Sequence, residues 1–278
     1  MFRRPARSLA IGVAALVALP LAACSSDDAA SSSADTATAT IAAAAPTSTT
    51  TSTAPEPATR SWIANVLPTV RQVIVHESPN GPHLHLDTSG TGGFVPVVIP
   101  NPLPSGAPTT FHIERRTVAA ADGSLWHEVD LPVRPNGSTG WISADDVTLT
   151  HTDMSAVISL SAHTLTLSDG DAVLATYPVA VGAAPTPTPT GRFFVKELVE
   201  PPNRNGAYGP LAYGLTAHSD ALIDTEAFAD GVIGMHGTNQ PSLIGTDVSH
   251  GCVRLRNADV LDLQKRQVPL GMPVTITA

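Results

Sequence analysis

One short segment near the C-terminus, "TDVSHGCVRL" (residues 246–255), combines a cysteine with residue types that can activate it. A cysteine attacks a carbonyl carbon as its thiolate, and it needs a nearby base or cation because a free thiol titrates near ~8.5. His250 stands two residues before Cys252, and His236 stands 16 residues before it in "GMHGT" (residues 234–238). The two histidines are therefore candidate bases for a thiol-dependent acyl transfer.

Each histidine is followed by a glycine, Gly237 and Gly251. A glycine lets backbone amides or carbonyls approach a reacting centre without a Cβ in the way. Attack on a carbonyl also needs donors for the oxyanion that forms. The competing interpretation makes the histidines ordinary core residues and Cys252 an inert, buried thiol. Residue types alone permit a thiol enzyme here without naming one.

The chain has only two cysteines, and the other one lies near the N-terminus. An arginine-rich start is followed by an apolar run from Leu9 to Ala23, which is too short to cross a bilayer core of ~30 Å comfortably. The end of that run, Leu21 to Cys24, resembles a bacterial lipobox. The resemblance implies a lipoprotein signal peptide at residues 1–23 and lipidation of Cys24. Two or more acyl chains would anchor the protein stably, and Cys24 could then form no disulfide with Cys252.

Residues 24–60 are rich in Ser, Thr, Ala and Pro, and such a stretch buries too little apolar surface to order itself. We therefore expect a disordered tether, which would hold a folded part at the outer face of the cell membrane, in the cell envelope. The formal net charge of −9 indicates an acidic surface that repels phosphate backbones. Nucleic acid is therefore not an expected partner.

Residues 61–150 alternate short apolar stretches with Gly, Pro and Asn, a pattern typical of a small all-β module. The segment "WHEVDLPVRPNGSTGWISADDV" resembles bacterial SH3-like domains, which implies a small β-barrel with Trp126 and Trp141 in its core. His83 and His85 are spaced like metal ligands, but we expect them to be surface residues of a strand.

Residues 151–278 read as a mostly-β domain. The stretches 164–167 and 173–181 flank Asp169-Gly170, which predicts a β-hairpin, and "GMPVTIT" predicts a closing strand. One short helix is predicted, with Asn257 as its N-cap and one face that comprises Val260, Leu261 and Gln264.

The segment Ser249-His250-Gly251-Cys252-Val253-Arg254 and the upstream His236-Gly237 resemble the L,D-transpeptidase catalytic (YkuD-type) family. The segments "TPTPTGRF" and "GMPVTI" are also similar to that family, so the resemblance covers about residues 150–277. It implies a β-sandwich with one short helix. Between Glu200 and Asp230 the resemblance is loose and assigns no substrate contacts.

The resemblance implies a role for each motif residue. Cys252 would be the nucleophile and His236 its base, with the Gly237 carbonyl holding the other imidazole nitrogen. His250 and Gly251 would shape the oxyanion site and the cysteine turn. Two further residues are expected on the substrate side: Arg254, either as a clamp for a carboxylate or as a loop brace, and Ser249, whose hydroxyl is expected to brace the loop.

The implied reaction is peptidoglycan cross-linking. Cys252 would attack the third residue of a tetrapeptide stem, release D-alanine and form a thioester, which an amine of a neighbouring stem would convert into a 3→3 cross-link. No metal or cofactor is expected, and carbapenem β-lactams are expected inhibitors. Two alternatives remain open: an L,D-carboxypeptidase or hydrolase that uses water as acceptor, and a non-catalytic cell-wall-binding lipoprotein.

Overall fold

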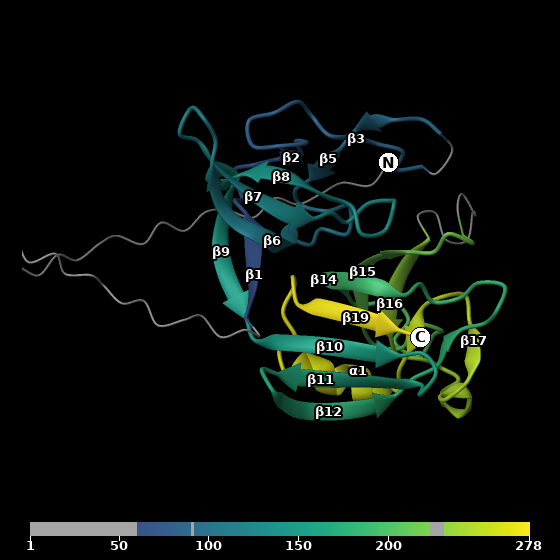
Figure 1. Ribbon diagram of the computed structural model, residues 1–278. Helices are drawn as coiled ribbons and strands as arrows, with labels where there is room; N and C mark the ends of the chain where they lie inside the picture. The colour runs from purple at the N-terminus through teal and green to yellow at the C-terminus, as the bar shows by residue number, and fades with distance from the viewer. Residues whose placement is uncertain (1–59, 90–91, 223–230) are drawn as a thin grey trace, which may run out of the picture. The chain divides into compact units, whose positions relative to one another are not determined.

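The computed structural model describes residues 60–89, 92–222 and 231–278, with the side chain of Arg116 excepted (Figure 1). These residues belong to one compact unit, Ala54–Ala278. The predicted signal peptide, the lipidation site at Cys24 and the tether up to residue 59 lie outside the described residues. Within the described ranges, no helix has the length and apolarity needed to cross a membrane.

The N-terminal region (residues 60–152) is built on one antiparallel five-stranded sheet. Its order is β8 (Thr139–Ser143), β7 (Leu125–Asp130), β6 (Thr110–Ala119), β1 (Ser61–Val66) and β9 (Val147–Thr152). Two short pairs accompany it, β2 (Gln72–Ile74) with β5 (Val98–Pro100) and β3 (His85–Leu86) with β4 (Val95–Pro96). A single turn of 3-10 helix, η1 (Ala144–Asp146), precedes β9. The all-β character is as predicted, while the SH3-like barrel stays a prediction.

The aromatic and histidine side chains of this region differ in burial. Trp126 is buried, as predicted for a core residue. Trp141 is only half-buried, because its strand alternates and the neighbouring Gly140 and Ile142 are the residues that face the core. His83 and His85 are exposed, as expected for surface residues.

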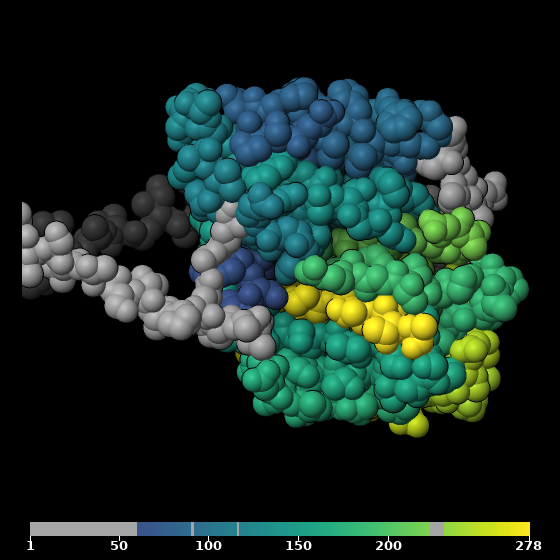
Figure 2. Space-filling view, viewed as in Figure 1, coloured from purple at the N-terminus to yellow at the C-terminus, as the bar shows by residue number. Residues whose placement is uncertain are grey.

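The C-terminal region (residues 153–278) contains one eight-stranded sheet. Its order is β12 (Ala172–Pro178), β11 (Thr164–Asp169), β10 (Met154–Ser159), β19 (Pro273–Thr277), β14 (Gly191–Val199), β15 (Ala212–His218), β16 (Val232–His236) and β18 (Val253–Arg254). The predicted hairpin is present as β11 and β12, and Gly170 adopts the positive φ of 55° that its tight turn requires. The predicted closing strand is β19, which lies between β10 and β14 and appears in Figure 2 as a yellow band.

β14 joins the two halves of this sheet. Its first residues, Gly191 to Phe194, pair with β19, and its last residues, Val195 to Val199, pair with β15 after a register shift. The expected sandwich is therefore a single hydrogen-bonded sheet whose halves share β14. Between them lies one apolar cluster that includes Leu165, Tyr213, Met235 and Val274. A two-stranded parallel pair, β13 (Val181–Gly182) with β17 (Asp247–Ser249), and a second 3-10 turn, η2 (Pro241–Leu243), complete the region.

The one α-helix, α1 (Asn257–Lys265), differs from its prediction in two details. Its N-cap is Arg256 and not Asn257, because the Asn257 Oδ1 accepts the backbone N–H of Thr238 at 2.8 Å. Its buried residues are Val260 and Leu263, while Gln264 is exposed. The inward face is thus an i, i+3 pair directed to β16, which α1 contacts.

Candidate active site

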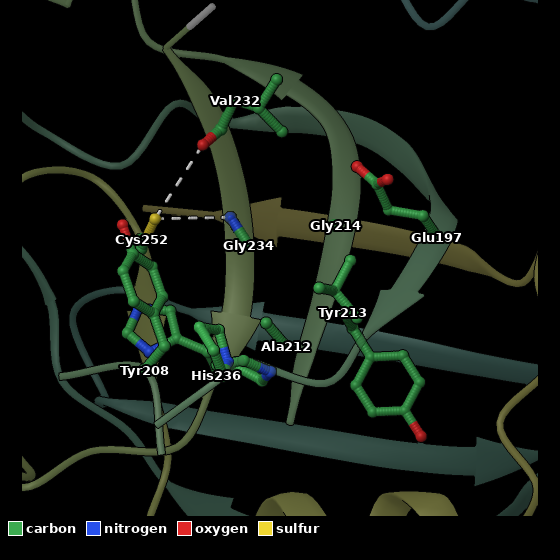
Figure 3. A pocket seen from close by; sticks show the side chains of 12 residues that line it. Glu197, Tyr208, Ala212, Tyr213, Gly214, Val232, Gly234, His236 and Cys252 are labelled. Atoms are coloured by element: carbon green, nitrogen blue, oxygen red, sulfur yellow. Dashed lines mark hydrogen bonds between the residues drawn. The ribbon is translucent and has the colours of Figure 1, made fainter. Parts of the chain in front are cut away.

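Two parallel strands, β16 and the edge strand β18, bring the cysteine motif and the upstream histidine together. Met235 and His236 of β16 pair with Val253 and Arg254 of β18, which places Cys252 beside the middle of β16. The Gly234 N–H lies 3.5 Å from the Cys252 Sγ, and that sulfur lies 4.0 Å from the Val232 carbonyl oxygen (Figure 3). The thiol therefore lies against the backbone of β16. Within the part of the chain that the structure describes, Cys252 is a free thiol.

His236 ends β16 and is only 4% exposed. Its Nδ1 lies 2.6 Å from the carbonyl oxygen of Gly237, the contact expected from the sequence. Because a carbonyl can only accept, Nδ1 carries the proton and Nε2 remains the basic nitrogen. Gly237 must be a glycine, since a Cβ there would lie 2.4 Å from the Asn257 Oδ1.

Burial keeps both reactive groups neutral. Removal from water lowers the pKa of His236 to about 4; the Gly237 carbonyl opposes this shift and the positive charge of Arg254 adds to it. Burial likewise raises the pKa of the Cys252 thiol, against the Gly234 N–H and the Arg254 charge, which both lower it. The resting pair is therefore a thiol and a neutral imidazole.

The turn before Cys252 is fixed by Gly251 and Ser249. Gly251 has a φ of 111°, and a Cβ on it would lie 2.7 Å from the Ile233 Cδ1, so no other residue fits without strain. The buried Ser249 hydroxyl donates to the Cys252 carbonyl at 2.6 Å and accepts the Gly251 N–H at 3.1 Å. Ser249 thus braces the loop, and because it also lines a pocket at the thiol, its place on the substrate side stays a prediction. The Gly251 amide is engaged in the same brace; Gly251 forms the turn, and its part in shaping the oxyanion site stays a prediction.

The segment "TPTPTG" stabilises this turn through threonine hydroxyl groups. Thr188 donates its hydroxyl to the Gly251 carbonyl at 2.8 Å and accepts the Gly182 N–H at 2.8 Å, and Thr186 donates to the Ser249 carbonyl at 3.3 Å. The sequence analysis missed both threonines. No local pattern indicated them, because each contact joins residues 63 positions apart in the chain.

Two pockets open on the thiol, and they share Cys252, His236 and Tyr208. The first has a volume of about 300 Å³, and its other lining residues are largely apolar: Glu197, Val199, Pro201, Pro202, Ala212, Tyr213, Gly214, Val232 and Gly234. The second has a volume of about 280 Å³, and it adds Ala207, Ser249, His250 and Arg254. Cys252 and His236 thus line both pockets.

Tyr208 lies in the stretch where the family resemblance assigns no contacts. Its ring centroid is 4.7 Å from that of His236, and the side chain is otherwise 43% exposed. Burial against the site raises the pKa of its phenol. Close packing behind it is possible because a Cβ on Gly209 would lie only 2.7 Å from the Gly237 Cα. The Gly and Pro residues around Tyr208 were the available signal, since they mark a turn that can present an aromatic ring.

Arg254 and His250 both line the second pocket. The Arg254 backbone is fixed by two hydrogen bonds with Ala180, and its guanidinium makes one long hydrogen bond, 3.4 Å, to Gln240. Its charge is therefore available to an anion in that pocket. His250 is exposed there, so an oxyanion role stays a prediction.

A potential metal-binding group lies in the N-terminal region, away from the thiol. Within the described ranges, ligand atoms of His112, Glu114 and Asp130 fall within 4.8 Å of one another. His112 is hydrogen-bonded to Asp130 at 2.7 Å, and Glu114 forms an ion pair with Arg192 at 3.1 Å. These local partners account for the group, which the sequence pattern did not indicate because it joins two strands.

The C-terminal region is similar to known proteins. Residues 153–276 match the family model of the L,D-transpeptidase catalytic domain, YkuD. A Bacillus subtilis protein provisionally named L,D-transpeptidase YkuD is 41% identical over 119 residues, which are 43% of this chain and 63% of that protein. Its Bacillus licheniformis counterpart is 41% identical over 120 residues, with the same shares. The chain thus spans less than two thirds of the length of these curated relatives.

Among solved structures, an L,D-transpeptidase from Mycobacterium smegmatis is 18% identical, covers 60% of this chain and 95% of its own, and has a TM-score of 0.36. At that TM-score the likeness carries no structural argument, so the assignment rests on the sequence matches. The family-model match covers Cys252, His236 and the loops that hold them, and residues 153–276 are thus similar to L,D-transpeptidase catalytic domains.

Proposed function

We propose that this protein is a peptidoglycan L,D-transpeptidase that forms 3→3 cross-links through a thioester on Cys252. The observation that carries the proposal is that the Cys252 thiol and the basic histidine His236 together line two adjoining pockets. A transferase needs room for a donor and an acceptor at one sulfur. The family match of residues 153–276 supports the same reaction class.

The first half-reaction uses the neutral thiol–imidazole pair. The Cys252 sulfur attacks the carbonyl carbon of the third residue of a tetrapeptide stem, while His236 Nε2 takes the thiol proton. The bond to D-alanine breaks, and the imidazolium returns the proton to the leaving amine. A thioester remains on Cys252 and His236 is neutral again. The low pKa of His236 favours this return, because the buried imidazolium is a strong acid.

The second half-reaction needs an amine in the other pocket. An amine of a neighbouring stem attacks the thioester, the carbon–sulfur bond breaks, and the amine proton returns to the thiolate through His236. The outcome is an amide between two third residues. Water in place of the amine would give the hydrolase alternative, and the presence of two pockets favours transfer.

The charges of the pockets indicate which stem occupies which side. Arg254 in the second pocket suits the terminal carboxylate of the donor stem, since guanidinium groups bind carboxylates well. Glu197 is the acidic residue among those that line the first pocket, where it would attract an acceptor ammonium. We therefore assign the second pocket to the donor and the first to the acceptor.

The N-terminal sequence supports a proposal for where the enzyme acts. We propose a lipoprotein anchored to the cell membrane through Cys24, with residues 24–60 as a tether to the cell wall and an SH3-like module at 61–150. The lipobox-like end of the apolar run supports the anchor. An intact mass of the mature protein should show lipid on Cys24, and an unlipidated mature chain would contradict the anchor.

Carbapenem β-lactams are proposed inhibitors. Their strained carbonyl would be attacked by the same sulfur, with the ring nitrogen as leaving group, and the second pocket offers Arg254 to the carbapenem carboxylate. The adduct should map to Cys252 and be absent from Cys252→Ala.

Product analysis tests the proposed reaction. Purified protein is incubated with a disaccharide-tetrapeptide, and the products are sequenced by tandem mass spectrometry. We expect a dimer joined between two third residues, together with free D-alanine. Tripeptide as the only product would establish the hydrolase, and unchanged substrate with folded protein would favour the non-catalytic, wall-binding alternative.

A further inference from the structure

The loop that connects β7 to β8, residues 131–138, contacts the C-terminal region at the end of β15; we call it the docking loop. The Asn136 Nδ2 donates to the His218 carbonyl at 2.7 Å, and the Asn136 Oδ1 accepts the His218 N–H at 2.9 Å. One side-chain amide thus satisfies both backbone groups of His218, as a neighbouring β-strand would. His218 is buried, so water cannot readily replace these two bonds.

A second residue of the docking loop, Arg134, holds the next turn. Its guanidinium is buried and donates from Nη2 to the Ser219 carbonyl at 2.7 Å. The same Nη2 would lie 2.7 Å from a Cβ on Gly231, so the guanidinium packs directly over that glycine. The Ser219 N–H in turn donates to the Gly231 carbonyl at 2.8 Å. Arg134 therefore fixes the backbone at the residue before β16 begins.

The path from this turn to the sulfur is short. His218 pairs with Val232, the first residue of β16, and the Val232 carbonyl and the Gly234 N–H are the backbone groups nearest the Cys252 sulfur. Between Gly214 and His218 the pairing of β15 with β16 shifts register. Such an irregularity weakens the ladder locally, so the His218–Val232 end depends on contacts from outside the sheet. The docking loop supplies those contacts.

We propose that the docking loop sets the geometry of the thiol site, with Asn136 and Arg134 as positioning residues for the reaction of Cys252. The N-terminal region is then part of the working enzyme and not only a spacer or a wall-binding module. The inference concerns the same site and rests on the proposed function for its kinetic consequence, while its structural consequence can be measured without any turnover.

The main test compares Asn136→Ala with Asn65→Ala in the full chain. Asn65 also uses its side-chain amide for two hydrogen bonds, to Thr148 and Thr150, but both lie inside the N-terminal sheet. In Asn136→Ala we expect faster hydrogen exchange at residues 231–236 and a kcat for cross-linking that falls roughly tenfold, because a small misplacement of reacting groups is costly. The KM should change less than twofold, since neither pocket loses a lining residue.

A second pair of variants tests rescue by a conservative change. Arg134→Ala should behave like Asn136→Ala, while Arg134→Lys, which keeps a cationic donor for the Ser219 carbonyl, should retain at least a third of the wild-type kcat. This pair carries the same test if Asn136→Ala does not fold.

Two results would overturn the proposal. One is equal exchange at residues 231–236 and equal kcat in Asn136→Ala and Asn65→Ala. The other is a lowered melting temperature in Asn136→Ala with normal kcat per folded molecule, which would make the docking loop a mere joint between regions. Failure of the proposed function would look different, because the wild type itself would then form no cross-link while the exchange comparison still reported on the coupling.

Discussion

The two regions of the molecule each bury a histidine, and the contrast between them shows what makes one of the two a candidate base. His127 in the N-terminal sheet and His236 in the C-terminal sheet are both almost inaccessible to water, and burial lowers the pKa of both. His236 is oriented by the Gly237 carbonyl and lines two pockets that also contain a thiol. The Nδ1 of His127 has no hydrogen-bond partner among the described residues, and His127 lines neither thiol pocket. A lowered histidine pKa indicates burial, and the residues around the imidazole determine whether it can act as a base.

Substituting both histidines in the same manner is the strongest test of the difference between His236 and His127. His236→Asn should lower the rate of cross-linking by roughly 10²–10⁴-fold, the usual range for loss of a general base. His127→Asn should leave that rate within about threefold of wild type, because His127 contacts neither reacting group. Initial rates on folded, thiol-titrated protein make the measurement. Similar losses in both variants would mean that burial, and not position, explains the effect of His236.

The same histidines should make the fold acid-sensitive. The pKa of His236 is about 4 when folded and near 6.5 when unfolded, so the unfolded state binds more protons between these values. Stability is therefore lost as pH falls from about 6.5 toward 4, by roughly 3 kcal/mol at most from His236, at about 1.4 kcal/mol per pKa unit. His127 acts in the same direction.

Urea unfolding at a series of pH values measures this loss. The slope of unfolding free energy against pH should be shallower in His236→Asn than in wild type. Equal slopes would show that His236 is not buried as a neutral imidazole.

Alanine substitutions of two glycines distinguish a steric clash of the added Cβ from the backbone strain of a positive φ at the cysteine turn. Gly251 and Gly245 both have positive φ, 111° and 94°, but only Gly251 has a neighbour, the Ile233 Cδ1, in the way of a Cβ. Both alanine variants should lose about 1–3 kcal/mol of stability from backbone strain. Gly251→Ala should lose more and should also slow acylation of Cys252, because the turn carries the cysteine. If the two variants had equal effects on stability and on acylation, the contact of a Cβ at Gly251 with Ile233 would not explain the need for glycine.

The smallest expected effect concerns Thr188, which is hydrogen-bonded to the cysteine turn. Thr188→Val removes a donor to Gly251 and an acceptor for Gly182, and should cost about 1–2 kcal/mol of stability, with a modest loss of rate. Thr166→Val is a matched control, since the Thr166 hydroxyl makes only a long contact with Thr176, 3.4 Å. Thermal unfolding of the two variants suffices, and a control that is as destabilised as Thr188→Val would contradict the assignment.

Sequence reasoning reached the parts of the site that are local in the chain. His236 and Gly237 are adjacent residues, and Ser249 to Arg254 form one turn, so their types and order already carry the geometry. The missed contacts join segments far apart in sequence. Thr188 reaches across to Gly251, and Asn136 of one region meets His218 of the other. No local pattern encodes such pairings.

The helix shows the same limit on a smaller scale. Asn257 has the residue type of an N-cap, yet its side chain is used by the Thr238 amide from another loop. Local capping preference was outweighed by a tertiary hydrogen bond, which moved the cap to Arg256. Tyr208 was missed for a related reason, because nothing in its own segment indicates that its ring packs beside His236.

The most direct test of the central claim is the intact mass of the protein after incubation with a tetrapeptide donor and no acceptor. The account predicts a mass increase equal to the donor minus D-alanine, mapped by proteolysis to Cys252 and absent from Cys252→Ala. A folded protein that gains no mass and releases no D-alanine, or an adduct that persists in Cys252→Ala, would contradict it.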